Sequence, residues 1–249
     1  MNEIVVQTKN LTKRFGRFTA VDNISMTVYR GEIFGFLGAN GAGKTTAIRM
    51  LCGLLRPTSG EGQVAGFDIV HETEKIKSRI GYMSQKFSLY EDLRLEENLE
   101  FFGGMYGLAG SRLNSRMDQM IRQFQLDSLK NRLTVSLPLG WKQKLALACS
   151  LLHDPEILFL DEATGGVDPI TRRNFWDIIG ELANNGKTIF VTTHYMDEAE
   201  YCHRIVIMAA GKIVVTGSPI KLKQQFNKKS IEELFIDLVK QNNPSSDDK

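Results

Sequence analysis

Nine residues in the early part of the chain, "GANGAGKTT", combine three glycines with a lysine and two threonines. They fit the spacing G-x-x-x-x-G-K-[ST], in which the glycines let the backbone curl so that successive N–H groups face a polyphosphate. The lysine reaches the β and γ phosphates, and the hydroxyl after it ligates magnesium. The predicted phosphate-binding residues are Gly38, Ala39, Asn40, Gly41, Ala42, Gly43, Lys44, Thr45 and Thr46, with Thr45 also on the metal.

Two adjacent carboxylates, Asp161 and Glu162, end the apolar segment "EILFLDE". Side chains alternate along a strand, so we expect the two carboxylates on opposite faces, with different tasks. Asp161 is predicted to hold magnesium, and Glu162 to polarise an attacking water. An apolar run that ends in Asp-Glu is also typical of a strand that stops at a surface turn. Combined with the phosphate loop, it indicates nucleotide hydrolysis.

The elements that must position these residues can be predicted from hydrophobic patterning. Residues 32–38, "EIFGFLG", form an unalternating apolar run, and helical spacing follows the glycine loop, which predicts strand, loop and helix in that order. Buried strands are also predicted at 156–162 and 187–194, with a helix at 170–185 between them. This alternation indicates a parallel α/β core.

Other segments are expected to surround that core. Short strands at 4–9 and 24–30 suggest a small antiparallel sheet, and residues 91–130 show helical patterning only, which predicts a helical subdomain inserted in the core. The patterns also predict a hairpin at 204–217, an amphipathic helix at 230–241 and a disordered polar tail. The predicted division is a domain at 1–225, with its core at 1–85 and 145–225 and its helical subdomain at 86–144, followed by a C-terminal helix and tail at 226–249.

Composition narrows the class of protein. The chain is 42% hydrophobic and 24% charged, with 31 basic against 29 acidic residues and no basic stripe, so nucleic acid is not a favoured partner. There is no apolar run of membrane-spanning length and no secretory pattern at the start, so we expect a soluble chain. Cys52, Cys149 and Cys202 lie far apart in apolar segments, which favours buried reduced thiols and the cytoplasm.

Together, these motifs resemble the nucleotide-binding subunit of an ATP-binding cassette (ABC) transporter, from about Lys9 to Gly217. The resemblance implies ATP and Mg²⁺ as ligands, and a P-loop NTPase core. It implies that Phe15 in "LTKRFG" stacks on adenine, although a position in the β-sheet core is the competing interpretation. Gln85 matches the glutamine that senses magnesium and the γ phosphate, and His194 in "VTTHYMDEAE" matches the switch histidine of the catalytic site.

The stretch "LPLGWKQ" lies where the family carries its Leu-Ser-Gly-Gly-Gln signature, directly before a helix. In the family this helix start caps the γ phosphate of ATP held by a second subunit, so the resemblance predicts a site shared between two chains. Here Pro138 and Leu139 replace the serine and the first glycine, which removes a hydroxyl contact worth about 1.5–3 kcal/mol but leaves a helix N-terminus. The residues expected to act on the other chain's ATP are Pro138, Leu139, Gly140, Gln143 and Asp168.

The same strings resemble a branch of bacterial ABC-2 type exporters of drugs or lipids. This implies a second cassette, identical or paralogous, and membrane permease subunits that dock near residues 85–93 at the cytoplasmic face of the membrane. Two other classes of protein share these motifs: a nucleic-acid-associated ATPase of the superfamily, which would carry coiled coils or tandem cassettes, and a regulatory ATP-binding protein with weak hydrolysis. Lys44, Asp161, Glu162 and His194 argue against the regulatory class, whereas Pro138 and Leu139 keep it open.

Overall fold

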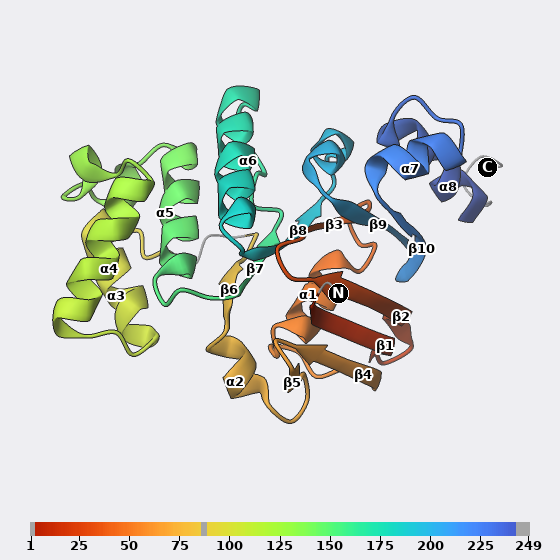
Figure 1. Cartoon of the computed structure of the whole chain (residues 1–249), viewed down its shortest axis with the longest axis horizontal. Helices are drawn as coiled ribbons and strands as arrows, with labels where there is room; N and C mark the ends of the chain where they lie inside the picture. The colour runs from red at the N-terminus through yellow and green to blue at the C-terminus, as the bar shows by residue number, and fades with distance from the viewer. Residues whose placement is uncertain (1–2, 86–88, 243–249) are drawn as a thin grey trace.

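A computed structural model describes residues 3–85 and 89–242 of the chain. A group of helices lies at one end of the long axis of the molecule, and the remainder contains two sheets that lie against each other (Figure 1). The strands are β1 (Ile4–Phe15), β2 (Phe18–Tyr29), β3 (Ile33–Leu37), β4 (Ser59–Val64), β5 (Phe67–Asp68), β6 (Ile80–Met83), β7 (Ile157–Asp161), β8 (Thr188–Thr193), β9 (Arg204–Ala209) and β10 (Lys212–Gly217). The helices are α1 (Lys44–Leu51), α2 (Thr73–Lys77), α3 (Leu95–Met105), α4 (Gly110–Gln123), α5 (Leu139–Leu151), α6 (Pro169–Asn184), α7 (Pro219–Gln225) and α8 (Ile231–Asn242), with short 3₁₀ turns η1 (Asp127–Leu129), η2 (Thr134–Ser136) and η3 (Met196–Tyr201).

The larger sheet has six strands in the order β10-β9-β3-β8-β7-β6. Neighbouring strands are parallel from β9 through β3, β8 and β7 to β6. Strand β10 pairs with β9 in an antiparallel hairpin. Every residue of β3, β7 and β8 is buried, as expected for strands covered on both faces. The predicted parallel α/β core is confirmed, and β8 lies between the two strands that carry the phosphate loop and the carboxylates.

The smaller sheet is antiparallel, in the order β2-β1-β4-β5, as predicted for the N-terminal region. Its strands β1 and β2 are twelve residues each, longer than the sequence patterns suggested, and they meet at a turn where Phe15 pairs with Phe18. Strands β4, β5 and β6 and helices α2 and α7 were not predicted from the sequence. Strand β4, "SGEGQV", is mostly exposed and contains two glycines, so it shows no hydrophobic alternation.

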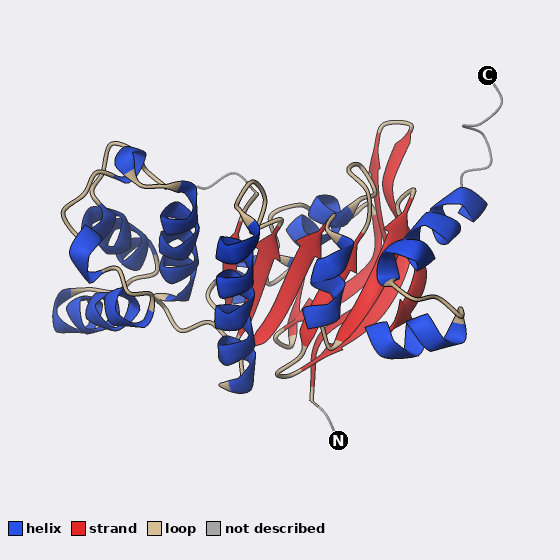
Figure 2. Cartoon of the chain, turned by 90° about the horizontal axis from the view of Figure 1, so that it is seen from above, coloured by secondary structure: helices blue, strands red, loops and turns tan. Residues whose placement is uncertain are grey.

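Two hydrophobic cores lie on the two faces of the larger sheet. One joins it to the smaller sheet and to α1, and contains the packed rings of Phe34, Phe36, Phe159 and Phe190. The other joins it to α5, α6 and the C-terminal helices, and continues into α3 and α4. Figure 2 shows helices gathered at one end of the molecule and along one face of the strands.

Helices α3, α4 and α5 form the group at one end of the molecule (Figure 1). Helix α5 contacts α3, α4 and strand β6, and it runs without a break across residues 144 and 145, where the sequence analysis placed a domain boundary. The helical patterning predicted between 91 and 130 is confirmed by α3 and α4. The division of the chain into domains stays a prediction, and the predicted disorder of 243–249 lies outside the described residues.

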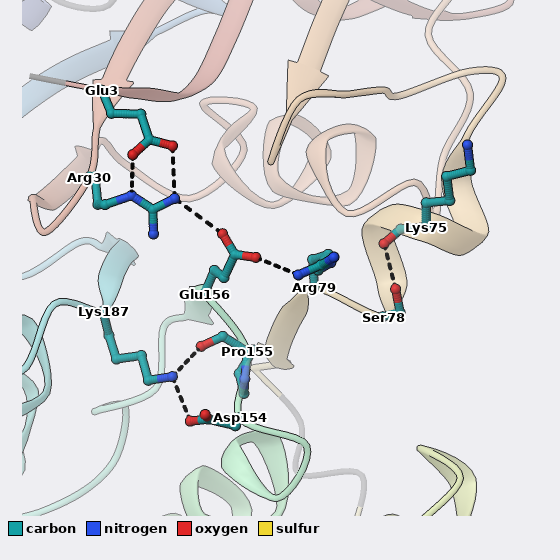
Figure 3. Close-up of polar contacts among 9 residues, drawn as sticks. All are labelled: Glu3, Arg30, Lys75, Ser78, Arg79, Asp154, Pro155, Glu156 and Lys187. Atoms are coloured by element: carbon teal, nitrogen blue, oxygen red, sulfur yellow. Dashed lines mark hydrogen bonds and ion pairs between the residues drawn. The ribbon is translucent and has the colours of Figure 1, made fainter.

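A charged cluster lies at the end of the sheet opposite the phosphate loop. Glu156 accepts from Arg79 at 2.8 Å and from Arg30 at 3.3 Å, and Arg30 also pairs with Glu3 (Figure 3). Glu156 stands directly before β7, so this cluster ties the start of that strand to β2 and β6. Across the sheet, Lys187 binds Asp154 at 2.7 Å before β8 begins.

All three cysteines are free and buried, as predicted, and burial raises the pKa of each thiol. Burial thus disfavours the thiolate form, and these side chains pack in the apolar core. Within residues 3–85 and 89–242, no helix is both long enough and apolar enough to cross a membrane.

Candidate nucleotide-binding and catalytic site

The phosphate loop connects β3 to α1, as the sequence predicts. Gly43, the residue before the helix, has a φ of 102°, and a Cβ there would lie 2.4 Å from the carbonyl oxygen of Ala20. A Cβ on Gly38 would lie 2.7 Å from the carbonyl oxygen of Met208. Only glycine fits at these two positions, because the loop is pressed between β2 and β9.

A cavity of about 300 Å³ opens above this loop. Most of its lining comes from the predicted phosphate-binding residues, joined by Gln85 and Glu162. The lining residues are Phe18, Ala20, Asn40, Gly41, Gly43, Lys44, Thr45, Thr46, Gln85 and Glu162. The structure therefore brings residues from four separate parts of the sequence to one polar hollow at the carboxyl ends of the parallel strands, where ligands bind in open α/β sheets.

Glu162 lies at the centre of the polar contacts. One of its carboxylate oxygens is 3.2 Å from the Lys44 ammonium, and the other accepts from the Gln85 amide at 2.9 Å. Nδ1 of His194 is 3.2 Å from that second oxygen, without the alignment of a hydrogen bond. Glu162 and Lys44 are both buried, so this ion pair is little screened by solvent.

The two adjacent carboxylates do not point to opposite faces, and that prediction is wrong. Oδ1 of Asp161 accepts from the Thr45 hydroxyl at 3.0 Å, while Glu162 reaches Lys44, the neighbouring residue. The reason is that Glu162 lies beyond β7 with a φ of 50°, so strand alternation no longer applies to it. Its backbone N–H is fixed by Thr192 of β8 at 3.0 Å, which holds this conformation.

Asp161 is almost fully buried and sits beneath the phosphate loop. Its Oδ1 also accepts from the Thr192 hydroxyl at 2.6 Å, while Oδ2 is buried with no hydrogen-bond partner among the described residues. A buried carboxylate oxygen without a donor, next to the Thr45 hydroxyl, has the chemistry that Mg²⁺ selects.

The aromatic residue that lines the cavity is Phe18, and the stacking of Phe15 on adenine stays a prediction. Phe15 is 50% exposed and does not line the cavity, and the Lys13 ammonium lies 5.1 Å from the centre of its ring. Phe18, its partner across the hairpin turn, is 64% exposed and does line the cavity. The competing interpretation of Phe15 as a sheet-core residue is wrong, since the ring is exposed. Phe18 was not among the predicted residues, and the repeated phenylalanine in "RFGRF" was the available signal.

The "LPLGWKQ" residues lie outside this cavity. Pro138 is the N-cap of α5, and Leu139 and Gly140 form its first turn. Gln143 is buried, and its amide donates to the carbonyl oxygen of Gly165 at 3.4 Å. The segment therefore packs against the loop after Glu162 in the same chain.

Asp168 ends that loop and caps helix α6. Its carboxylate accepts from the backbone N–H groups of Ile170 and Thr171, each at 3.0 Å, and from the Thr171 hydroxyl at 2.6 Å. These bonds hold the pKa of Asp168 below its usual range, the Thr171 hydroxyl contributing most. Asp168 thus has a local capping role in addition to the one that the family resemblance implies.

The glycine loop, its buried lysine and the carboxylates facing it define a nucleotide-binding protein of the phosphate-loop class. The chain belongs to the ABC transporter family: residues 21–165 match the family's model. It is similar to the probable multidrug ABC transporter ATP-binding protein YbhF of Escherichia coli, with 51% identity over 95% of this chain. The chain spans 42% of that relative's length. It is also 37% identical to the daunorubicin resistance ATP-binding protein DrrA3 of Streptomyces coeruleorubidus, over 90% of this chain and 72% of that one.

Solved structures agree with this assignment. An ATP-binding subunit of an ABC transporter superimposes with a TM-score of 0.83 at 28% identity, covering 94% of this chain and 99% of the other. A dimeric ATP-binding cassette in a post-hydrolysis state, bound to ADP and Pi, gives a TM-score of 0.77 at 25% identity, covering 86% and 98%. The expected P-loop fold with its antiparallel and helical parts is confirmed.

Proposed function

We propose that this chain hydrolyses ATP and thereby powers an ABC exporter. The observation that carries the proposal is the position of Glu162, whose two carboxylate oxygens lie between Lys44, Gln85 and His194 at 2.9 to 3.2 Å. A carboxylate held beside a phosphate loop is the arrangement that hydrolysis needs, because it can polarise a water facing the γ phosphate.

Each of these residues has a separate role in the proposal. Lys44 and the loop N–H groups hold the β and γ phosphates, and the ammonium leaves Glu162 for the γ phosphate when ATP binds. Glu162 then accepts a proton from the attacking water. His194 contacts the γ phosphate and orients Glu162. Gln85 senses the bound nucleotide and couples its presence to the segment that follows Gln85.

The residues around Asp161 fit a magnesium ion. Thr45 and Asp161 would hold it, with Gln85 nearby, and the unpartnered Oδ2 of Asp161 supplies the free acceptor. Bound Mg²⁺ would offset negative charge on the β and γ phosphates during transfer.

A second cassette completes the site in this proposal. Pro138, Leu139, Gly140 and Gln143 would face ATP held by the partner, and Asp168 would cross toward it. Exposed apolar side chains support an interface here: Leu139 is 39% exposed and Ile170 is 75% exposed. The similarity to a dimeric cassette supports the same arrangement. The remaining helix N-terminus of α5 supplies N–H groups for the phosphate in place of the lost serine.

The transport role is proposed from the relatives. Their names refer to multidrug transport and daunorubicin resistance, so we propose export of a drug-like or lipid-like molecule by a permease of the ABC-2 type. The permease would dock near residues 85–93 and hold the chain at the cytoplasmic face of the membrane. Tyr90, which is 44% exposed, supports a contact surface there, and residues 86–88 lie outside the described residues. The subdomain predicted at 86–144 would move as a unit against the core.

Glu162→Gln tests the proposal. We expect hydrolysis to fall by at least about a hundredfold, because the proton acceptor is lost, while ATP binding persists. The variant should therefore form a dimer with ATP and Mg²⁺ on size-exclusion chromatography. Glu156→Gln, at the other end of the same strand, is the matched control and should hydrolyse at the wild-type rate. Hydrolysis by Glu162→Gln at that same rate would remove Glu162 from the mechanism.

A further inference from the structure

Glu198 is a fully buried carboxylate that has no part in the roles described above. It lies in η3, four residues after His194, with no exposed surface. Burying a charge is costly unless other groups compensate it. The contacts that Glu198 makes therefore indicate what this charge does for the fold.

Its first contact joins two segments that leave neighbouring strands. The hydroxyl of Thr164 donates to Oε1 of Glu198 at 2.6 Å, and Thr164 is itself buried. Thr164 follows Glu162 at the end of β7, while Glu198 follows His194 at the end of β8. One short hydrogen bond to a charged acceptor thus connects the loop at 163–168 with the segment after His194.

A second contact runs through helix α6. Nε of Arg172 lies 3.7 Å from Oε1 of Glu198, and the Arg172 guanidinium lies 3.8 Å from the centre of the Tyr195 ring. That ring is 4.2 Å from the ring of His194. A continuous series of packed groups therefore leads from Glu198 to His194.

The bonding of Glu198 is incomplete. Its Oε2 is buried with no hydrogen-bond partner among the described residues, and the contact with Arg172 is longer than a hydrogen bond. Apolar side chains in place of both a buried charge and its partners often give equal or better stability. The charge is better explained by the position it imposes on its partners than by the stability it adds.

We propose that Glu198 is a positioning residue that fixes the loop at 163–168 relative to His194. That loop ends at Asp168, which the proposed function directs toward a second cassette. A change in the position of this loop on contact with the second cassette would then change the position of His194 through Thr164 and Glu198. His194 would be aligned with Glu162 only when the loop is in place. This inference rests on the proposed hydrolysis of ATP.

Thr164→Val tests the proposal with little change in shape, because only the hydroxyl is lost. We expect kcat to fall about tenfold, the loss of one such bond, with KM for ATP unchanged. Thr164→Ser should keep wild-type kcat, because it retains the hydroxyl. Glu198→Gln should show an intermediate loss, because it retains an acceptor oxygen but not the charge.

A matched control separates positioning from stability. Thr188 is an equally buried threonine on β8, and its hydroxyl accepts from the N–H of Gly31 at the other end of the sheet. Thr188→Val should lower the unfolding midpoint in urea as much as Thr164→Val, and leave kcat unchanged. Equal losses of kcat in the two variants, or no loss in Thr164→Val, would overturn the proposal.

A second measurement does not depend on hydrolysis. Backbone hydrogen exchange of residues 194–201 should be faster in Thr164→Val than in the wild-type protein or in Thr188→Val. If the wild-type protein fails to hydrolyse ATP while this exchange difference is present, the proposed function fails and the positioning role of Glu198 stands. If exchange at 194–201 is the same in all three proteins, the positioning role is wrong.

Discussion

The Cγ2 methyl of Thr171 lies 2.6 Å from the point that a Cβ atom on Gly140 would occupy. The first turn of α5 is thus packed against the first turn of α6 with no space for a side chain. Thr171 cannot turn away freely, because its hydroxyl is bonded to Asp168. The start of α5, which we propose contacts the partner's ATP, therefore packs against the start of α6, where Asp168 ends its loop. These two segments hold each other in position within one chain.

Gly140→Ala should destabilise the protein by about 1–3 kcal/mol, because the added methyl forces this contact apart. Combining it with Thr171→Ser should restore most of the loss, since serine lacks Cγ2 and keeps the hydroxyl for Asp168. Urea unfolding measures both. Gly104→Ala in α3 is the control, because among the described residues nothing outside its own helix backbone lies within 4 Å of its Cβ position, and it should be neutral or stabilising. A double variant as unstable as Gly140→Ala would contradict the packing argument.

Mixing two inactive variants should restore hydrolysis if the site is shared. Lys44→Ala removes the phosphate-binding lysine of its own chain, and Leu139→Glu places a carboxylate beside the partner's γ phosphate. In a mixed dimer both lesions fall in one site, and the other site is intact. Leu139 is the better position for this test than Gly140, because it is exposed and an acid in the first turn of a helix does not oppose folding.

The ATPase rate of the two variants is measured singly and mixed, across a range of concentrations. Leu139→Gln provides the matched control, because it has the same shape without the charge and should retain more activity than Leu139→Glu. No recovery on mixing, although both variants associate in the presence of ATP, would show that "LPLGWKQ" is simply the start of a helix.

Stability should decrease as the pH falls from 6.5 toward 4, because of His153. Burial lowers the pKa of this histidine to about 4, its ring being stacked on Tyr106 at 3.6 Å. The unfolded chain, with an ordinary histidine pKa of 6.5, then binds a proton that the folded chain does not. The contribution is fully present above pH 6.5 and is lost as pH falls through this window.

Urea midpoints measured between pH 7.5 and 4 test this effect. His153→Phe keeps an aromatic ring against Tyr106 and cannot be protonated, so its midpoint should fall less steeply over the window from 6.5 to 4. Parallel curves for the two proteins would assign the acid sensitivity to other groups.

Glu156→Ala should cost about 1 kcal/mol or less, because its ion pairs with Arg30 and Arg79 are partly exposed. The loss should shrink in high salt, which screens such pairs. Urea unfolding at low and high sodium chloride provides the measurement. A loss of several kcal/mol that is insensitive to salt would mean that the cluster in Figure 3 is a buried structural site.

Several features could be read from the sequence because they are local. The phosphate loop is one contiguous stretch whose glycine spacing and helix start fix its backbone within a few residues. The buried strands β3, β7 and β8 were predicted from short apolar runs, and α6 from its helical periodicity. The phosphate loop, the Asp161-Glu162 strand end and the strings around Gln85 and His194 resemble the family from the sequence alone.

Tertiary structure alone decided which of these residues meet. The pattern of β7 gave Glu162 a strand orientation, yet its φ of 50° turns it toward Lys44, because β8 lies between β3 and β7 and its Thr192 holds the turn. The hairpin presents Phe18 to the cavity, and Thr171 covers Gly140, through packing between distant segments. Local sequence patterns encode backbone preference and burial. The pairing of strands and the positions of side chains depend on the whole core, because many weak contacts must form there together.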